Sequence, residues 1–151
     1  MVRRTFCTAV VTGLLCVQAF PAGADFSGRV VAVVSGDCLE VLRAGRRERI
    51  RLVEIACPRK GKPWFEAARE FTAQAALDRA VSVVEGQPGR RGEAADVTLP
   101  GNRSLTRELL RNGLARCNAS RSSDPSLELL EADARAARRG MWKKAIRNSG
   151  F

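Results

Sequence analysis

The chain contains no histidine and no tyrosine, and these two absences exclude several kinds of functional site. Without histidine, the protein cannot build a Ser-His-Asp triad, a Cys-His nucleophile or a histidine-ligated metal centre. Any catalysis must therefore use carboxylates, arginines, lysines or a metal ion held by oxygen atoms. Aromatic residues make up only 5% of the chain, and its two tryptophans are Trp64 and Trp142. Few aromatic side chains are therefore available for base stacking, a common way to bind single-stranded nucleic acid.

Acidic residues are scarce beside basic ones. The chain has 26 lysines and arginines but 16 aspartates and glutamates, which gives a net charge of +10 over 151 residues. This length fits one domain with one hydrophobic core. A strongly basic surface favours anionic partners, such as nucleic acid, phospholipid or acidic cell-wall polymers. The alternative is that the charge serves solubility alone.

The first 24 residues have the pattern of an export signal. Arg3 and Arg4 provide a positive start, an apolar run extends over residues 6–20, and Ala22-Gly23-Ala24 has the small-x-small pattern of a cleavage site. The run is shorter than the roughly 20 apolar residues of a membrane-spanning helix. We therefore predict a signal peptide over residues 1–24, a periplasmic or secreted protein, and no stable membrane span after cleavage. An uncleaved membrane anchor is the alternative.

Cysteines are few in the mature part of the chain. Cys7 and Cys16 belong to the predicted signal, which leaves Cys38, Cys57 and Cys117. No pair of them has the spacing of a zinc site, and there is no histidine to complete a mixed one. In an oxidising compartment, three thiols allow one disulfide and one unpaired cysteine. A buried and unreactive cysteine is the alternative for each.

The spacing of apolar residues predicts strands first and helices later. Alternation and turn residues predict five strands, over 26–34, 37–42, 48–55, 81–85 and 94–99. Apolar spacing of three to four residues and helix-end signals predict three helices, over 64–79, over 104–112 and from Asp124 to Gly140. Five short strands of this kind can close into an oligonucleotide-binding (OB) barrel, although element order alone leaves other arrangements open.

Six segments carry a resemblance to a known family. They lie in order along the chain, at residues 36–41, 49–59, 60–67, 95–100, 105–115 and 131–142. They resemble, in the same order, the segments that define the staphylococcal nuclease family. The resemblance implies an α+β fold, namely a five-stranded OB-fold barrel with three helices over residues 25–142, followed by a tail at 143–151.

The resemblance also implies a chemistry. Members of this family are calcium-dependent phosphodiesterases that cut DNA and RNA. Carboxylates hold the hard cation, two arginines stabilise the charge that builds on the phosphate, and a glutamate positions the attacking water. On this pattern Asp37 is a metal ligand, and Arg51 is the first catalytic arginine, which binds the nucleic-acid phosphate.

The remaining positions of the family pattern are changed in this chain. Ala56 stands where the second metal-binding aspartate is implied, Arg59 where the glutamate is implied, and Gly92 where the second arginine is implied. Arg90 and Arg91 lie just before Gly92, so a shifted loop could return one of them. The aromatic residues that flank the nucleotide in the family are absent from residues 118–121.

These changes make the implied metal pocket more positive by three charge units. A divalent ion with one carboxylate left would bind weakly, because ligand charge sets calcium affinity. We therefore expect no cofactor, or calcium if the protein is active, and nucleic-acid contacts from Arg51, Arg59, Arg90 and Arg91. Local explanations remain open: Asp37 as a turn residue, Arg51 as an ordinary surface arginine, and Arg90-Arg91 as a solvated charge run.

Two further hypotheses concern the implied pocket. Arg59 is expected to lie near Asp37 as a fixed cation in place of the ion. Cys38 and Cys57 flank the same site, and a disulfide between them could replace the ion as a clamp.

The sequence thus favours a catalytically impaired module that binds nucleic acid or another polyanion. A calcium-dependent phosphodiesterase with an altered site is the alternative. A third possibility is an envelope protein whose barrel binds another protein.

Overall fold

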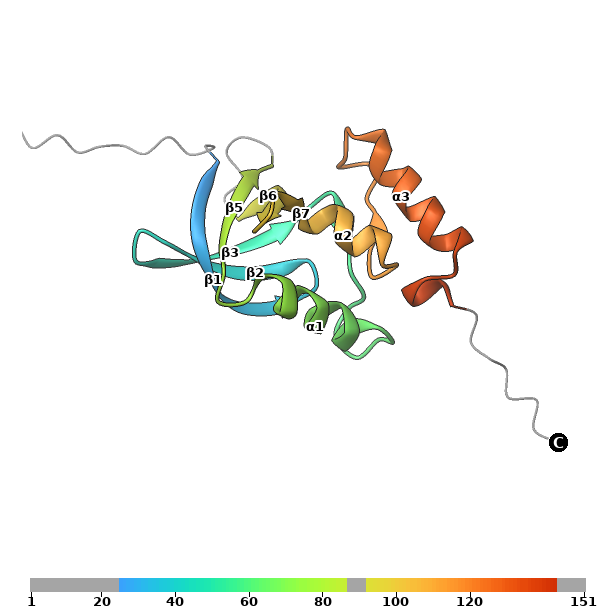
Figure 1. Ribbon diagram of the computed structural model, residues 1–151, viewed down its shortest axis with the longest axis horizontal. Helices are drawn as coiled ribbons and strands as arrows, with labels where there is room; N and C mark the ends of the chain where they lie inside the picture. Colours follow the sequence, from blue (N-terminus) through green and yellow to red (C-terminus); the bar gives the residue numbers. More distant parts are fainter. Residues whose placement is uncertain (1–24, 87–91, 144–151) are drawn as a thin grey trace, which may run out of the picture.

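The computed structural model describes residues 25–86 and 92–143 (Figure 1). The predicted signal peptide, Arg90, Arg91 and all but the first residue of the tail lie outside the described residues. The five longer strands are β1 (Phe26–Ser35), β2 (Cys38–Arg43), β3 (Arg46–Leu52), β5 (Ala80–Glu85) and β6 (Glu93–Leu99). Three two-residue strands accompany them: β4 (Ile55–Ala56), β7 (Arg103–Ser104) and β8 (Arg116–Cys117).

The five longer strands form a closed barrel, as predicted. Four antiparallel pairings give the order β3-β2-β1-β5-β6, and a parallel pairing of β3 with β6 closes the ring. The closing pairs are Arg51 with Glu93 and Leu52 with Ala94. Alternate residues along the strands point into the barrel, where Val30, Leu39, Val41, Ile50, Leu52, Val83 and Val97 are buried. Closure places the end of β3 beside the start of β6, and the site is built around this junction.

Three helices pack outside the barrel, and all three are shorter than predicted, the first and the last by the most. They are α1 (Phe65–Ala76), α2 (Leu105–Arg111) and α3 (Pro125–Ala136), and a short 3-10 helix, η1 (Gly140–Trp142), follows. Helix α1 ends early because Asp78 has a φ of 60° and its N–H donates to the Val30 carbonyl instead. Helix α3 ends early because Arg138, with a φ of 52°, leaves the helical conformation. No helix in the described part of the chain is long and apolar enough to cross a bilayer.

The small β4–β8 sheet was not predicted, and it positions a loop at the site. Ile55 pairs with Cys117, and Ala56 pairs with Arg116. Just beyond β8, the Asn118 N–H donates to the Glu54 carbonyl at 2.7 Å. Two-residue strands have no periodicity that a sequence can show. Their pairing nevertheless brings residues 118–121 next to the end of β3.

A buried hydrogen bond fixes the β1–β2 turn against helix α1. The Thr72 hydroxyl donates to the Gly36 carbonyl at 2.8 Å, and Thr72 is fully buried. Gly36 itself has no room for a side chain, because a Cβ there would lie 2.7 Å from the Cys57 sulfur and 2.9 Å from the Ala68 Cβ. The turn that carries Asp37 is therefore held by close packing as well as by a hydrogen bond.

Candidate functional site

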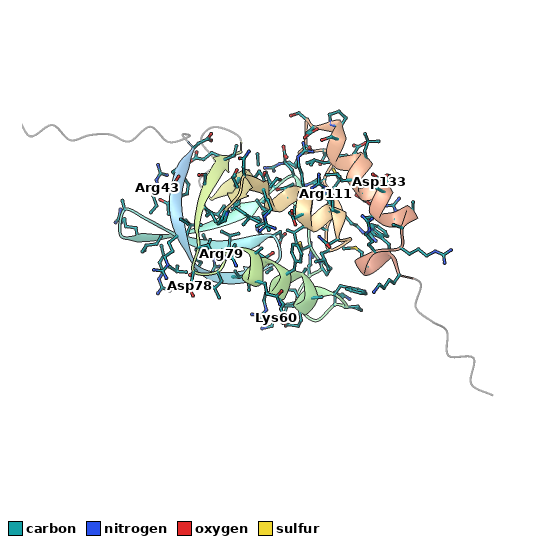
Figure 2. All side chains as sticks on the ribbon, in the orientation of Figure 1. Arg43, Lys60, Asp78, Arg79, Arg111 and Asp133 are labelled. Carbon is teal, nitrogen blue, oxygen red and sulfur yellow. The ribbon has the colours of Figure 1, made fainter. Side chains whose placement is uncertain are left out.

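A cleft of about 640 Å³ lies where the β1–β2 turn, the end of β3, the β4–α1 segment and the loop after β8 meet. It gathers four positions that the sequence singled out, Asp37, Arg51, Ala56 and Arg59. Lys60, labelled in Figure 2 near α1, also lines it. Positions from three separate segments of the sequence therefore share one cleft. Arg90 and Arg91 lie outside the described residues, so their contribution stays a prediction.

Asp37 is a buried carboxylate that lines the cleft. It is only 8% exposed, and its Oδ1 accepts a hydrogen bond from the Ser35 hydroxyl at 2.6 Å. Its backbone carbonyl accepts from the Leu52 N–H at 2.8 Å, which ties the turn to the end of β3. Asp37 thus has the local hydrogen bond expected of a turn aspartate and also a place in the cleft.

Arg51 lies on the exposed face of β3, directly above the barrel junction. It is opposite Cys38 on one side and Glu93 on the other, and its N–H donates to the Gly92 carbonyl at 2.7 Å. The ion pairs found among the described residues do not include the Arg51 guanidinium. This exposed guanidinium is therefore available to an anion that enters the cleft.

Gly92 cannot carry the second arginine that the family pattern places there. Its φ is 80°, in the region that favours glycine, and a Cβ would lie 2.7 Å from the Arg49 carbonyl oxygen. The carbonyl of Gly92 is also engaged by Arg51. The backbone that closes the barrel therefore requires glycine at this position.

The cleft does not fit a calcium ion. Calcium takes 6–8 oxygen ligands, several of them from carboxylates. Of the three acidic positions in the family pattern, only Asp37 keeps a carboxylate, since Ala56 offers a methyl group and Arg59 a cation. Residues 25–86 and 92–143 contain no group of three or more histidine, cysteine, aspartate or glutamate side chains that could hold a metal ion. The described side chains of the cleft therefore supply too few carboxylate oxygens for a calcium ion.

The expected pairing of Arg59 with Asp37 is wrong. Within the described part of the chain, no ion pair joins them, and Asp37 bonds Ser35 instead. Arg59 is exposed in the segment between β4 and α1, with its carbonyl accepting from the Lys62 N–H. A solvated arginine gains little from a surface ion pair, and the buried carboxylate already has a donor.

The hypothesis of a Cys38–Cys57 disulfide is also wrong, because both residues are free thiols. The Cys57 sulfur lies close to Gly36, where an added Cβ would be 2.7 Å away from it. Burial raises the pKa of the Cys57 thiol, and the nearby Asp37 carboxylate raises it further. Burial also raises the pKa of Cys38. Both thiols are therefore protonated at neutral pH and poor nucleophiles.

Sequence reasoning missed three charged residues of the cleft, Lys60, Glu93 and Arg121. Arg121 comes from the loop after β8 and forms an ion pair with Glu93 at the start of β6. One signal was present in the sequence, an arginine within the segment where the family's aromatic residues were missing. With these three, the described lining holds four basic side chains (Arg51, Arg59, Lys60, Arg121) and two acidic ones (Asp37, Glu93), a formal charge of +2.

The closed five-stranded barrel with three outer helices and a charged cleft beside β3 defines an OB-fold protein of the nuclease type. Residues 49–144 match the family described as staphylococcal nuclease homologue. The chain belongs to the staphylococcal nuclease family.

Three relatives show how far this similarity extends. The chain is 32% identical over 123 residues to an "uncharacterized endonuclease" of Escherichia coli O157:H7, covering 81% of this chain and 80% of the relative. It is 30% identical to "protein ParB" of Escherichia coli, covering 94% and 88%. It is 28% identical to a "micrococcal nuclease" of Shigella flexneri, covering 89% and 83%.

Proposed function

We propose that this protein is an exported domain of the nuclease family that binds nucleic acid and has lost efficient phosphodiester hydrolysis. The observation that carries the proposal is the charge of the cleft. In the family pattern this region holds a cation through several carboxylates, whereas here four basic side chains face two acidic ones.

The described side chains suit binding better than catalysis. Phosphate oxygens accept strong, charge-assisted hydrogen bonds from guanidinium groups, and Arg51, Arg59 and Arg121 all line the cleft. Hydrolysis also needs a group that accepts a proton from the attacking water. Arg59 cannot do this, because a guanidinium remains protonated at any physiological pH. The cleft can therefore neutralise a phosphate but lacks the base at the family position.

The second candidate is a calcium-dependent phosphodiesterase with an altered active site. Two observations favour it: Asp37 and Arg51 lie in the same cleft, and two of the relatives are named as nucleases. It requires additional oxygen ligands from outside the described carboxylates. Cleavage that depends on calcium would establish it.

The binding proposal predicts a salt-sensitive complex that needs no metal. Fluorescence anisotropy of a labelled single-stranded oligonucleotide, in chelator, should show a dissociation constant that rises steeply with salt. Each phosphate contact that is made contributes a slope of about 0.7 in a plot of log K against log salt concentration. Equal affinity at low and high salt, or no complex at low salt, would contradict the proposal.

Export is a separate part of the proposal and rests on residues 1–24. The basic start, the short apolar run and the small residues before Asp25 support it. N-terminal sequencing of the protein recovered from the periplasm or the medium should give Asp25 as the first residue. Recovery only from the cytoplasm, with Met1 retained, would refute export.

A further inference from the structure

The outer face of β3 carries a row of arginines that the cleft does not account for. Arg47, Arg49 and Arg51 alternate along the strand, so all three point to the same face. Consecutive members are roughly 7 Å apart, since a strand rises about 3.4 Å per residue. The side chains of Arg47 and Arg49 are 70% and 65% exposed. The row therefore begins near the β2–β3 hairpin and ends at Arg51, inside the cleft.

A carboxylate of β2, Glu40, lies against the outer two members of this row, Arg47 and Arg49. Glu40 of β2 is opposite Arg49 and contacts it at 3.0 Å, and its other oxygen is 3.9 Å from Arg47. One glutamate therefore faces two guanidiniums and cannot neutralise both. Surface ion pairs of this kind contribute little, so an incoming phosphate can replace the glutamate at small cost.

The hairpin that carries the row projects away from the helices. Figure 1 shows the β2–β3 hairpin extending to the side opposite α3. In Figure 2, Arg43 near this hairpin and Arg111 on α2 lie at separate parts of the molecule. No helix covers the end of the β2–β3 hairpin in Figure 1, and the side chains of Arg47 and Arg49 are exposed. A long ligand can therefore reach the row from solvent.

We propose that Arg47, Arg49 and Arg51 form a track that leads the sugar–phosphate chain of a single-stranded nucleic acid along β3 into the cleft. This inference rests on the proposed nucleic-acid binding and extends it from the cleft to a second surface. The track adds contacts for phosphates that lie outside the cleft.

The shape of the surface favours a single strand over a duplex. The track runs along an exposed strand and then enters a recess of about 640 Å³. Duplex DNA is stiff, with a persistence length of about 50 nm, so a flexible single strand can enter such a recess more easily. The one aromatic residue that lines the cleft, Phe65, is buried within the described structure. We therefore expect the protein to bind the strand through its phosphates, without preference for base sequence.

The test compares two double variants that remove the same charge from the purified protein. Arg47→Ala/Arg49→Ala alters the track, and Arg69→Ala/Arg111→Ala removes two exposed arginines from helices α1 and α2. The probes are thymidine oligonucleotides of about 4 to 16 nucleotides, the range of OB-fold site sizes. For the longer probes, the track variant should lose about 1.4 from the salt slope, about 0.7 for each lost phosphate contact. The helix variant should keep the original slope.

Two further measurements make the result specific. Glu40→Gln removes the carboxylate that competes with phosphate, so it should bind the long probe more tightly than the original protein. A thymidine dinucleotide, which fills only the cleft, should bind the original protein and the track variant equally. Circular dichroism confirms that each variant is folded before binding is measured.

The possible failures are distinguishable. If the track variant keeps the salt slope of the original protein on long probes, the track is refuted while binding in the cleft stands. An equal loss in both double variants refutes it too, because position on the surface then does not matter. If the original protein shows no salt-dependent complex with any probe, the proposed function itself fails.

Discussion

The double variant Ala56→Asp/Arg59→Glu is expected to bind calcium, and the unmodified protein is not. The two substitutions change the charge of the cleft by −1 and −2, and they place two carboxylates in the cleft that holds Asp37. Calcium affinity depends on the number of charged oxygen ligands, so the change from one carboxylate to three should have a large effect. Isothermal titration calorimetry with calcium chloride measures it directly.

Two control variants separate ligand chemistry from charge removal. Ala56→Asn/Arg59→Gln removes the cation at position 59 without adding carboxylates, and it should not bind calcium measurably. Asp37→Asn, added to the acidic variant, should abolish the new site. If the acidic variant binds no calcium while remaining folded, Asp37 does not share a metal position with residues 56 and 59. The family register applied to this cleft would then be wrong.

The second large effect is expected from Arg51→Ala/Arg59→Ala on binding of nucleic acid. A hydrogen bond to a charged group contributes about 1.5–3 kcal/mol, so each lost contact should weaken binding about tenfold or more. The pair should therefore lower affinity roughly a hundredfold at low salt and reduce the salt slope by about 1.4. Anisotropy titrations at several salt concentrations give both numbers.

Lysine substitutions provide the matched control for this pair. Arg51→Lys/Arg59→Lys keeps the charge but loses the planar, bidentate geometry of the guanidinium. It should retain most of the salt slope and lose only part of the affinity. If the alanine pair binds as tightly as the original protein, Arg51 and Arg59 do not contact the ligand, and the cleft is not the binding site.

The barrel could be predicted from the sequence because each of its strands has its own local signal. Alternation such as Ile50 and Leu52 between Arg49 and Arg51 indicates both the strand and its buried face. The helix ends were less predictable. Leu77 and Asp78 fit a helical pattern, yet the backbone turns at Asp78 because its N–H bonds to β1. Tertiary hydrogen bonding decides that boundary.

The site could be predicted only where residues match a family pattern in register. Asp37, Arg51, Ala56 and Arg59 were found in this way, and the structure places all four in the cleft. Arg121 could not be found from the family pattern, because the pairing of β4 with β8 is what brings its loop to the cleft. The hydrogen-bond partners of side chains could not be predicted from the sequence either. Asp37 accepts its hydrogen bond from the nearby Ser35 and not from Arg59.

The structure explains why glycine stands at position 92, where the family pattern implies an arginine. The sequence alone shows the difference but not its cause. The residue is required by a positive φ and by its close approach to Arg49 at the point where β3 meets β6. Loss of an arginine there is therefore built into the way this barrel closes. Among the described residues, Arg121 reaches this junction through its ion pair with Glu93, the residue after Gly92.

The central claim, that the cleft binds nucleic acid without cutting it, is tested most directly by the initial rate of phosphodiester hydrolysis. The unmodified protein is measured with calcium and with chelator, at concentrations where the complex is saturated. We expect single-stranded DNA and plasmid to stay intact under both conditions. Calcium-dependent cleavage that Asp37→Asn abolishes would show that the cleft still assembles a working metal site, and it would contradict the claim.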